Sequence, residues 1–180
     1  MTLARADLPT APEHKIVHSV DLLRRRLALC PRPWVFTNGV FDLLHRGHAA
    51  YLHQARALGG CLIVALNTDH SARQLGKGPG RPLNPQQDRA YLVAALASSS
   101  FVTWFDEPTP VALIEQLRPD IYVKGGDYDM PALAETALVR RWGGHAVAIP
   151  FLPGHSSTRL IQTLQTLPSP PATPPQRGPA

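Results

Sequence analysis

The sequence predicts an α/β fold, in which helices cover both faces of a doubly wound parallel sheet. Two patterns support this prediction. Short apolar segments alternate with segments of helical periodicity along most of the chain, and CLIVALN (61–67) is a continuous apolar run, typical of a strand covered on both faces. The chain has 180 residues, 44% of them hydrophobic, which suffices for one core and therefore a single domain. In such folds ligands bind at the carboxyl ends of the strands.

Apolar side chains at helical spacing predict an amphipathic leading helix within residues 14–30, packed on the domain. They are Ile16, Val20, Leu23 and Leu27. The elements expected after it are, in order, a strand over 34–39, a helix from 48 onward, a strand over 61–67, a helix over 85–97, a strand over 101–105, a helix over 110–117, a strand over 121–124, a helix over 133–142, a strand over 146–149 and a helix over 157–164.

Both ends of the chain are predicted to be disordered. Residues 1–13 are polar and contain proline, and residues 166–180 have too much proline and too few apolar groups to pack. The folded domain is therefore expected over residues 14–165.

Composition narrows the class of protein. No apolar run is long enough to cross a bilayer, and the first residues lack the apolar centre of a secretory signal, so we expect a cytoplasmic protein without a membrane partner. Cys30 and Cys61 form no CxxC pattern, which predicts two reduced thiols and no structural metal. The net charge of +5 is mostly scattered and lacks interleaved aromatic residues, which favours polyanionic small molecules over nucleic acid.

The segment TNGVFDLLHRGH, residues 37–48, carries the strongest indication of chemistry. It passes from the end of a predicted strand to the start of a predicted helix. Backbone N–H groups at a helix start lack intrahelical partners and attract anions, so His45 and His48 would add side-chain donors to a phosphate site. Gly47 leaves room for a close approach of the backbone. Taken alone, HxxH is equally typical of a half-built metal site or of two solvent-facing histidines.

Glycines and cations recur in LGKGPGRPLNPQQDR, which supplies Lys77, Arg81 and Arg89. Such a loop can close over a triphosphate or a sugar phosphate. It is not a Walker A loop, because GKGPGR has no Ser or Thr after its lysine. An ordinary flexible surface loop is the alternative interpretation.

Two further segments follow predicted strands. In KGGDY, Lys124 is a cation, and Asp127 either accepts sugar hydroxyls, helps to hold magnesium, or caps the turn before Pro131. GHSSTRLI opens the last helix with serines, a threonine and Arg159, which fits either simple N-capping or binding of the β- and γ-phosphates. All of these segments end strands, so we expect them to meet in one crevice.

The string GVFDLLHRGH resembles the HxGH signature of the cytidylyltransferase-like nucleotidyltransferases, which have a Rossmann-like fold. These enzymes join a nucleoside monophosphate to a phosphorylated small molecule and release pyrophosphate. Class I aminoacyl-tRNA synthetases share the element, but this chain has no KMSKS-like segment and little room for tRNA recognition.

With GKGPGRPLNPQQDR, PDIYVKGGDY and GHSSTRLI in this order, the chain from residue 15 to 164 resembles the heptose 1-phosphate adenylyltransferases of lipopolysaccharide core synthesis. The resemblance implies that ATP and D-glycero-β-D-manno-heptose 1-phosphate react to ADP-heptose and pyrophosphate, with Mg²⁺. It also implies the stand-alone form of a domain that many members fuse to a heptose 7-phosphate kinase.

The resemblance implies a role for each candidate residue, with His45 and His48 stabilising charge on the α-phosphate. Catalysis is expected of His45, His48, Lys77 and Arg159. Nucleotide binding is expected of Thr37, Asn38, Gly39, Phe41, Gly47, Arg89, Gly154, Ser156, Ser157 and Thr158. Acceptor binding is expected of Arg81, Lys124, Gly125 and Asp127.

Two other functions stay open on the sequence. A related transferase would use CTP or another acceptor, such as glycerol 3-phosphate, because HxGH does not separate ATP from CTP. A non-catalytic nucleotide-binding module would keep the pocket without turnover. The sequence also leaves open whether the chain forms a homo-oligomer.

Overall fold

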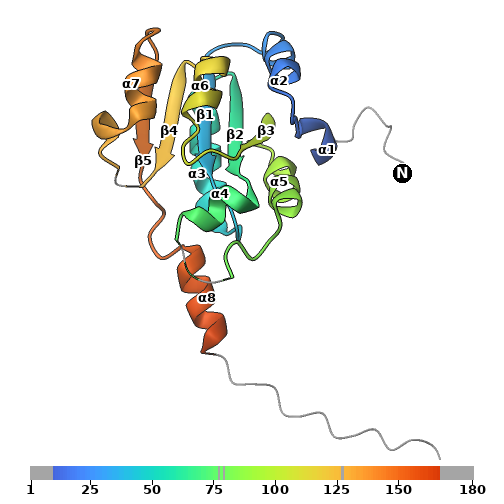
Figure 1. Ribbon diagram of the computed structural model, residues 1–180, viewed down its shortest axis with the longest axis vertical. Coiled ribbons are helices and arrows are strands. Elements are labelled where there is room, and N and C mark those ends of the chain that lie inside the picture. Colours follow the sequence, from blue (N-terminus) through green and yellow to red (C-terminus); the bar gives the residue numbers. More distant parts are fainter. Residues whose placement is uncertain (1–9, 77, 79, 127, 167–180) are drawn as a thin grey trace, which may run out of the picture.

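The computed structural model describes residues 10–166, apart from residues 77, 79 and 127. Its centre is a five-stranded sheet in the order β3-β2-β1-β4-β5, with all neighbours parallel (Figure 1). The strands are β1 (Trp34–Gly39), β2 (Cys61–Asn67), β3 (Phe101–Phe105), β4 (Ile121–Gly125) and β5 (His145–Ile149). The chain winds from β1 outward to β3 and then returns to the other side of β1. The doubly wound parallel sheet predicted from the sequence is therefore confirmed.

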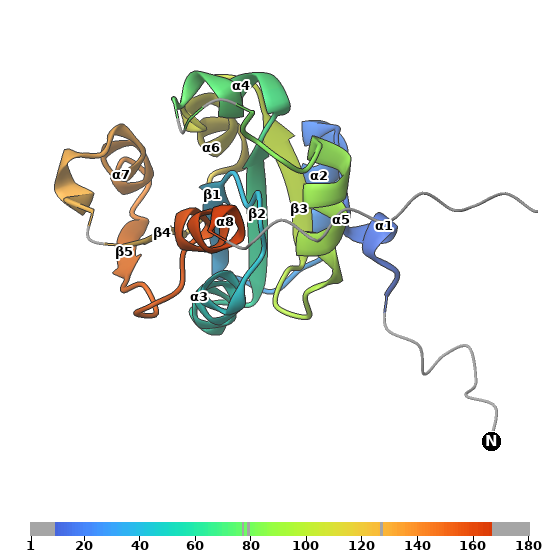
Figure 2. The ribbon, with the colours of Figure 1, turned by 90° about the horizontal axis from the view of Figure 1, so that it is seen from below.

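Helices cover both faces of this sheet, which Figure 2 shows along the strands. One core contains apolar residues of α2, α6 and α7, and the other contains those of α3 and α5. The helices are α1 (Pro12–Lys15), α2 (Val20–Leu27), α3 (Arg46–Ala57), α4 (Asp69–Gln74), α5 (Gln86–Ala95), α6 (Val111–Leu117), α7 (Ala134–Arg140) and α8 (Ser157–Gln165), with a short 3₁₀ turn, η2 (Met130–Ala132).

Alternation along the strands explains the two cores. Phe36 of β1 faces the α2 side, and its neighbour Val35 faces the α3 side. Every residue of β2 is buried, because β2 has a strand on each side and helices on each face. A fully buried Val, Leu or Ile side chain contributes about 1.5–3 kcal/mol to folding, so the apolar residues of β2 together stabilise the sheet strongly.

The leading segment differs from the single helix predicted over 14–30. A helix α1 begins at Pro12, inside the stretch expected to be disordered, and α2 begins only at Val20, where the Ser19 hydroxyl accepts from Leu22 N. Between the two helices, Ile16 bridges to Val102 and Val17 N donates to Val102 O. The apolar residue Ile16 is thus used at the edge of β3 rather than on a helix face.

Helix α4 was not predicted from the sequence, since DHSARQ has no apolar periodicity. The side chain of Thr68 caps the start of this helix. Helix α8 projects from the carboxyl edge of the sheet, and none of its residues is buried (Figure 1). Within the described residues, no helix has the length and apolar character that a membrane span requires.

Candidate active site

A cavity of about 700 Å³ lies at the carboxyl ends of the strands, beside the point between β1 and β4 where the winding reverses. Open α/β sheets bind ligands at this switch point. Most of the predicted site residues that the structure describes line it. These are Asn38, Gly39, Phe41, His45, Gly47, His48, Arg81, Lys124, Gly125, Ser156, Ser157 and Thr158.

The two histidines of the motif stand at the start of α3. His45 is its N-cap residue, and the imidazoles of His45 and His48 stack with ring centroids 3.9 Å apart. The ring of Phe41 lies 5.3 Å from that of His48 and closes the other side. Nδ1 of each imidazole is shut off from solvent, and both side chains are half-buried where they line the cavity.

The close packing around Gly47 explains why glycine stands between the histidines. A Cβ atom at this position would lie 2.9 Å from Nδ1 of His45 and 3.1 Å from Cβ of His155. Contacts this short force a neighbour to move. The absence of a side chain therefore lets the His45 ring and the loop before α8 approach the start of α3.

Burial lowers the pKa of His45 below its ordinary value of 6.5, and the nearby charge of His155 lowers it further. The two rings are 6.5 Å apart. Nδ1 of His155 donates to Pro153 O at 2.9 Å, which fixes that ring. The lowered pKa of His45 favours its neutral form, and a neutral imidazole still offers one N–H donor.

The start of α8 is attached to the motif that precedes α3. Ser156 caps α8, its Oγ accepting from Arg159 N at 3.1 Å, and Ser157 Oγ donates to Leu43 O at 3.2 Å. The second bond connects residues far apart in sequence and holds the α8 start near the two histidines. The N–H groups of this helix start and the imidazoles consequently face one cavity, as anion binding requires.

Asp42 organises the loop that carries Arg81. Its carboxylate accepts from Arg81 Nε at 2.6 Å and from the backbone N–H groups of Leu83 and Asn84 at 2.8 and 2.9 Å. Asn84 Nδ2 also donates to Asp42 O. This ion pair is nearly closed to solvent, and it fixes the Arg81 side chain on the cavity wall.

Arg89 was expected to bind the nucleotide, but the structure does not bring it to the cavity. Its side chain is fully buried and donates to the backbone oxygens of Asn84, Val40 and Asn67, at 2.6 to 3.0 Å. It also pairs with Asp69 at 2.7 Å. With its donors used in this way, Arg89 joins the segments that follow β1 and β2 and is a positioning residue.

Three other predicted residues also lie outside the described lining. Thr37 is buried beneath it, where its hydroxyl lies 2.5 Å from Tyr51 Oη, which in turn donates to Val123 O. Gly154 and Arg159 stand beside the cavity, and Arg159 Nη1 contacts Gly154 O at 3.5 Å. The predicted residues Lys77 and Asp127 lie outside the described residues.

Sequence reasoning did not select several residues that complete the cavity. Tyr51 packs against Gly125, where a Cβ atom would come within 3.1 Å of the tyrosine ring. Tyr128 contacts Lys124, whose Nζ lies 5.5 Å from its ring centroid. Tyr128 belongs to the predicted KGGDY segment, in which no role was assigned to it, whereas Tyr51 carries no motif and reaches the cavity only through the packing of α3. The other additions are Val40, Asp42, Asn67, Leu75, Pro108, Pro110, Glu135, Phe151 and His155.

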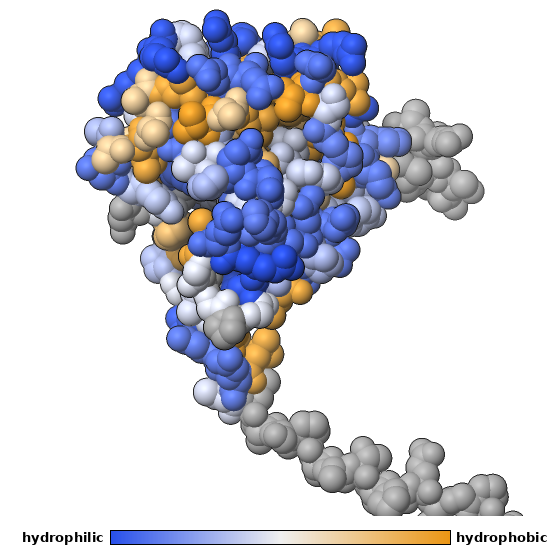
Figure 3. All heavy atoms as spheres, viewed as in Figure 1, coloured by the Kyte–Doolittle hydropathy of each residue, from blue (hydrophilic) through white to orange (hydrophobic). Residues whose placement is uncertain are grey.

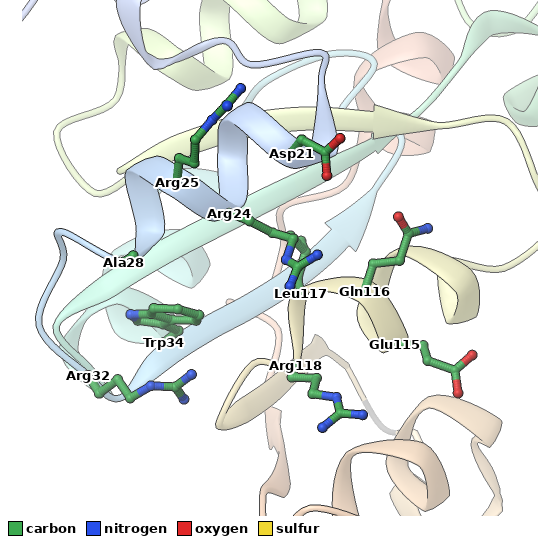
Figure 4. A pocket seen from close by; sticks show the side chains of 10 residues that line it. All are labelled: Asp21, Arg24, Arg25, Ala28, Arg32, Trp34, Glu115, Gln116, Leu117 and Arg118. Carbon is green, nitrogen blue, oxygen red and sulfur yellow. The ribbon is translucent and has the colours of Figure 1, made fainter.

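A second hollow, of about 860 Å³, lies at the opposite end of β1, between α2 and the end of α6. Figure 4 shows Arg24 reaching from α2 towards α6, with Arg32 and Arg118 nearby. Its arginines are exposed, and Arg32 pairs with Asp120 and stacks on Trp34. No predicted site residue lines this hollow. The surface in Figure 3 is largely hydrophilic over the middle of the face and at the end away from α8, with a band of hydrophobic residues between these two regions.

Comparison with known proteins identifies the class. The cytidylyltransferase-like family matches residues 36–163, and the chain belongs to this family; it is a nucleotidyltransferase. It is 59% identical over 150 residues to D-beta-D-heptose 1-phosphate adenylyltransferase from Bordetella bronchiseptica, a match that covers 83% of this chain and 93% of that protein. It is 52% identical over 127 residues to the bifunctional protein HldE from Streptomyces coelicolor, which covers 71% of this chain. This match spans only 27% of the bifunctional relative.

Solved structures agree with the fold. The crystal structure of the lipopolysaccharide core biosynthesis protein from Thermoplasma volcanium matches with a TM-score of 0.56 and 26% identity, over 66% of this chain and 95% of that chain. A pantoate-beta-alanine ligase from Francisella tularensis matches with a TM-score of 0.53 at 12% identity, over 83% and 76% of the two chains, which shows the shared fold alone. The family predicted from the sequence motifs is thus confirmed.

Nucleotidyl transfer from a nucleoside triphosphate generally uses a metal ion. Among the residues that the structure describes, no group of three or more histidine, cysteine, aspartate or glutamate side chains is placed to hold one.

Proposed function

We propose that this protein transfers the adenylyl group of ATP to D-glycero-β-D-manno-heptose 1-phosphate, giving ADP-heptose and pyrophosphate for lipopolysaccharide core synthesis. One observation carries the proposal: His45 and His48, at the start of α3, share a cavity with residues 156–158 at the start of α8. The 59% identity to a heptose 1-phosphate adenylyltransferase over nearly the whole relative supports the choice of acceptor.

The reaction needs alignment and charge neutralisation more than a proton transfer. An oxygen of the sugar phosphate attacks the α-phosphorus of ATP, and the bond from that phosphorus to the β-phosphate oxygen breaks. The nucleophile is already anionic, so no general base is required. We assign to His45 and His48 the donation of hydrogen bonds to α-phosphate oxygens, and to the start of α8 the binding of the departing pyrophosphate.

Other residues receive supporting roles in this proposal. Arg81, fixed by Asp42, supplies positive charge for the phosphates, and Lys124 does so on the β4 side. Lys77, Arg159 and Asp127 keep the roles expected from the sequence. Magnesium enters as the complex with ATP. The substrates are small molecules rather than nucleic acid, and we place the reaction in the cytoplasm, where ATP is made.

A pyrophosphate-release assay with purified protein and Mg²⁺ tests the proposal. ATP and CTP are each combined with heptose 1-phosphate and glycerol 3-phosphate. Turnover confined to ATP with heptose 1-phosphate is the expected result. Turnover with CTP or with glycerol 3-phosphate would replace the substrates and retain the chemistry, whereas no turnover in any combination would favour a nucleotide-binding module.

A further inference from the structure

Glu135 is the one acidic side chain of the described cavity lining that has no partner. It stands in the first turn of α7, only 7% of it is exposed, and it lines the cavity. No described residue forms an ion pair or a hydrogen bond with its carboxylate, whereas Asp42, the other acid of this lining, accepts three hydrogen bonds. Its oxygens are not among the described buried side-chain atoms that lack a partner, so in the free protein they meet water through the cavity, and a ligand that displaces this water must replace its hydrogen bonds.

The neighbours of Glu135 do not supply the missing donor. Burial raises the pKa of Tyr122, and the charge of Glu135 adds to the increase, so the two groups are close. The Tyr122 hydroxyl, however, donates to Asn38 Oδ1 at 3.1 Å. The hydroxyl proton of Tyr122 is therefore used in this hydrogen bond to Asn38 in β1 and is not donated to Glu135. The carboxylate is left facing the cavity with its accepting capacity unused.

The charge of Glu135 restricts what it can bind. A carboxylate repels triphosphate and pyrophosphate oxygens, but it accepts hydrogen bonds from hydroxyl groups at both of its oxygens. Helix α7 lies to one side of α8, beyond β4 (Figure 2). Since the proposed pyrophosphate site is at the start of α8 and the nucleophile must approach opposite the leaving group, the acceptor belongs on the side of β4 and α7.

We infer that Glu135 is the residue that recognises the sugar of the acceptor, by accepting hydrogen bonds from two of its hydroxyl groups. The inference rests on the proposed function and names the specificity contact of that site. Lys124 and Glu135 then act on opposite ends of one molecule, the cation attracting its phosphate and the carboxylate selecting its polyol. A phosphorylated acceptor without hydroxyl groups would leave the carboxylate buried and unpaired, and would bind weakly.

The test compares wild type with Glu135→Gln, which keeps the shape and removes the charge. Calorimetry measures the dissociation constant of heptose 1-phosphate in the presence of a non-hydrolysable ATP analogue, and steady-state kinetics measure both KM values. Hydrogen bonds to a charged group predict a loss of acceptor affinity of about 10- to 100-fold, with the KM for ATP unchanged. The matched control is Glu115→Gln, an exposed acid of the second hollow that pairs with Arg141.

A second measurement separates recognition from a general change in the fold. Acceptors that lack single hydroxyl groups are compared on both proteins, and the penalty for the missing hydroxyl should be large for wild type and small for Glu135→Gln. If that variant does not fold, as judged by its melting temperature, Glu135→Asp replaces it in the same comparison.

The outcomes distinguish this inference from the proposed function. Wild-type binding of heptose 1-phosphate without turnover would refute the proposed function and leave the Glu135 comparison intact. Turnover by wild type together with equal acceptor affinity in Glu135→Gln would overturn the inference alone. A rise in the KM for ATP instead of the acceptor would also overturn it, because the carboxylate would then serve the nucleotide.

Discussion

At the scale of single residues, we expect that a substitution of Gly47 lowers the catalytic activity without loss of the fold. Alanine favours a helix more than glycine does, so Gly47→Ala should keep the fold. Its methyl group, however, would lie 2.9 Å from the His45 ring and must displace it. We expect kcat/KM to fall about 100-fold, the usual size of a 1 Å misplacement of a reacting group. Steady-state kinetics and a thermal melt measure the two effects, and full activity would show that the ring position is unimportant.

His48 carries the second residue-scale prediction. Removing one preorganised donor to a transition state typically costs about 10²- to 10³-fold in rate, which we expect for kcat of His48→Ala. His53, exposed on the same helix, provides the control variant His53→Ala, whose kcat should equal that of wild type. A loss below about tenfold in a folded His48→Ala protein would remove His48 from the assigned role.

The pKa of His45 gives a third prediction. Burial keeps this pKa below 6.5 and His155 contributes the smaller part, so in His155→Gln the pKa should rise and still remain below 6.5. Because the unfolded chain binds the proton more readily than the folded one, this histidine lowers the free energy of unfolding as the pH falls below 6.5. NMR titration of the imidazole protons measures the pKa in both proteins. A pKa that is unchanged or lower would contradict the electrostatic contact.

The sequence predicted residues that line the cavity where the backbone itself forms its wall, and the roles assigned to them stay predictions. Glycines, serines and the end of an apolar run mark a helix start in the sequence, and these signals identified His45, Gly47 and residues 156–158. His155 lay in a predicted segment without a role assigned to it, and Glu135 was not found, because its position on the cavity depends on how α7 packs. Arg89 was misplaced for the same reason, since a cation in a loop sequence does not reveal which backbone oxygens surround it.

At the scale of elements, Arg89 predicts a large effect on stability. In Arg89→Met, Asp69 loses its buried partner and three backbone oxygens lose their donor. Breaking a buried pair from one side costs roughly 3–5 kcal/mol, which we expect as the decrease in the free energy of unfolding in urea.

Arg141→Met is the control for this variant. Arg141 pairs with Glu115 on the surface, and exposed pairs contribute at most about 1 kcal/mol. Equal losses in the two variants would mean that Arg89 does not join the segments after β1 and β2.

Most helices and strands lie where the sequence predicts them, because the apolar patterns that define them are long and regular. Strands β2 and β3 have the predicted limits, as continuous apolar or β-branched runs bounded by turns define a strand well. The leading helix was wrong over residues 16–19, because the single four-residue step from Ile16 to Val20 cannot distinguish a helix face from an extended segment that pairs with a sheet edge. Such pairing depends on Val102, far along the chain.

At the scale of the whole molecule, the described lining of the cavity ends at Thr158. We therefore expect that deletion of residues 168–180 leaves kcat and both KM values unchanged. Kinetics of the shortened and the full chain, at equal protein concentration, test this. A large loss of turnover would mean that these residues cover the site or join two copies of the chain.

The exposed position of α8 has a consequence for affinity. A nine-residue helix is too short to persist in water by its own hydrogen bonds, and no buried side chain adds to them. The hydrogen bond from Ser157 Oγ to Leu43 O opposes this unwinding at the helix start without abolishing it, so a fraction of molecules would still lack the arrangement of residues 156–158 that receives phosphates. The measured dissociation constant of the nucleotide equals the intrinsic constant divided by the fraction of molecules in which the helix start is formed. Nucleotide binding must therefore also supply the free energy that forms the helix start. Weak nucleotide binding would thus coexist with a well-formed transition-state site.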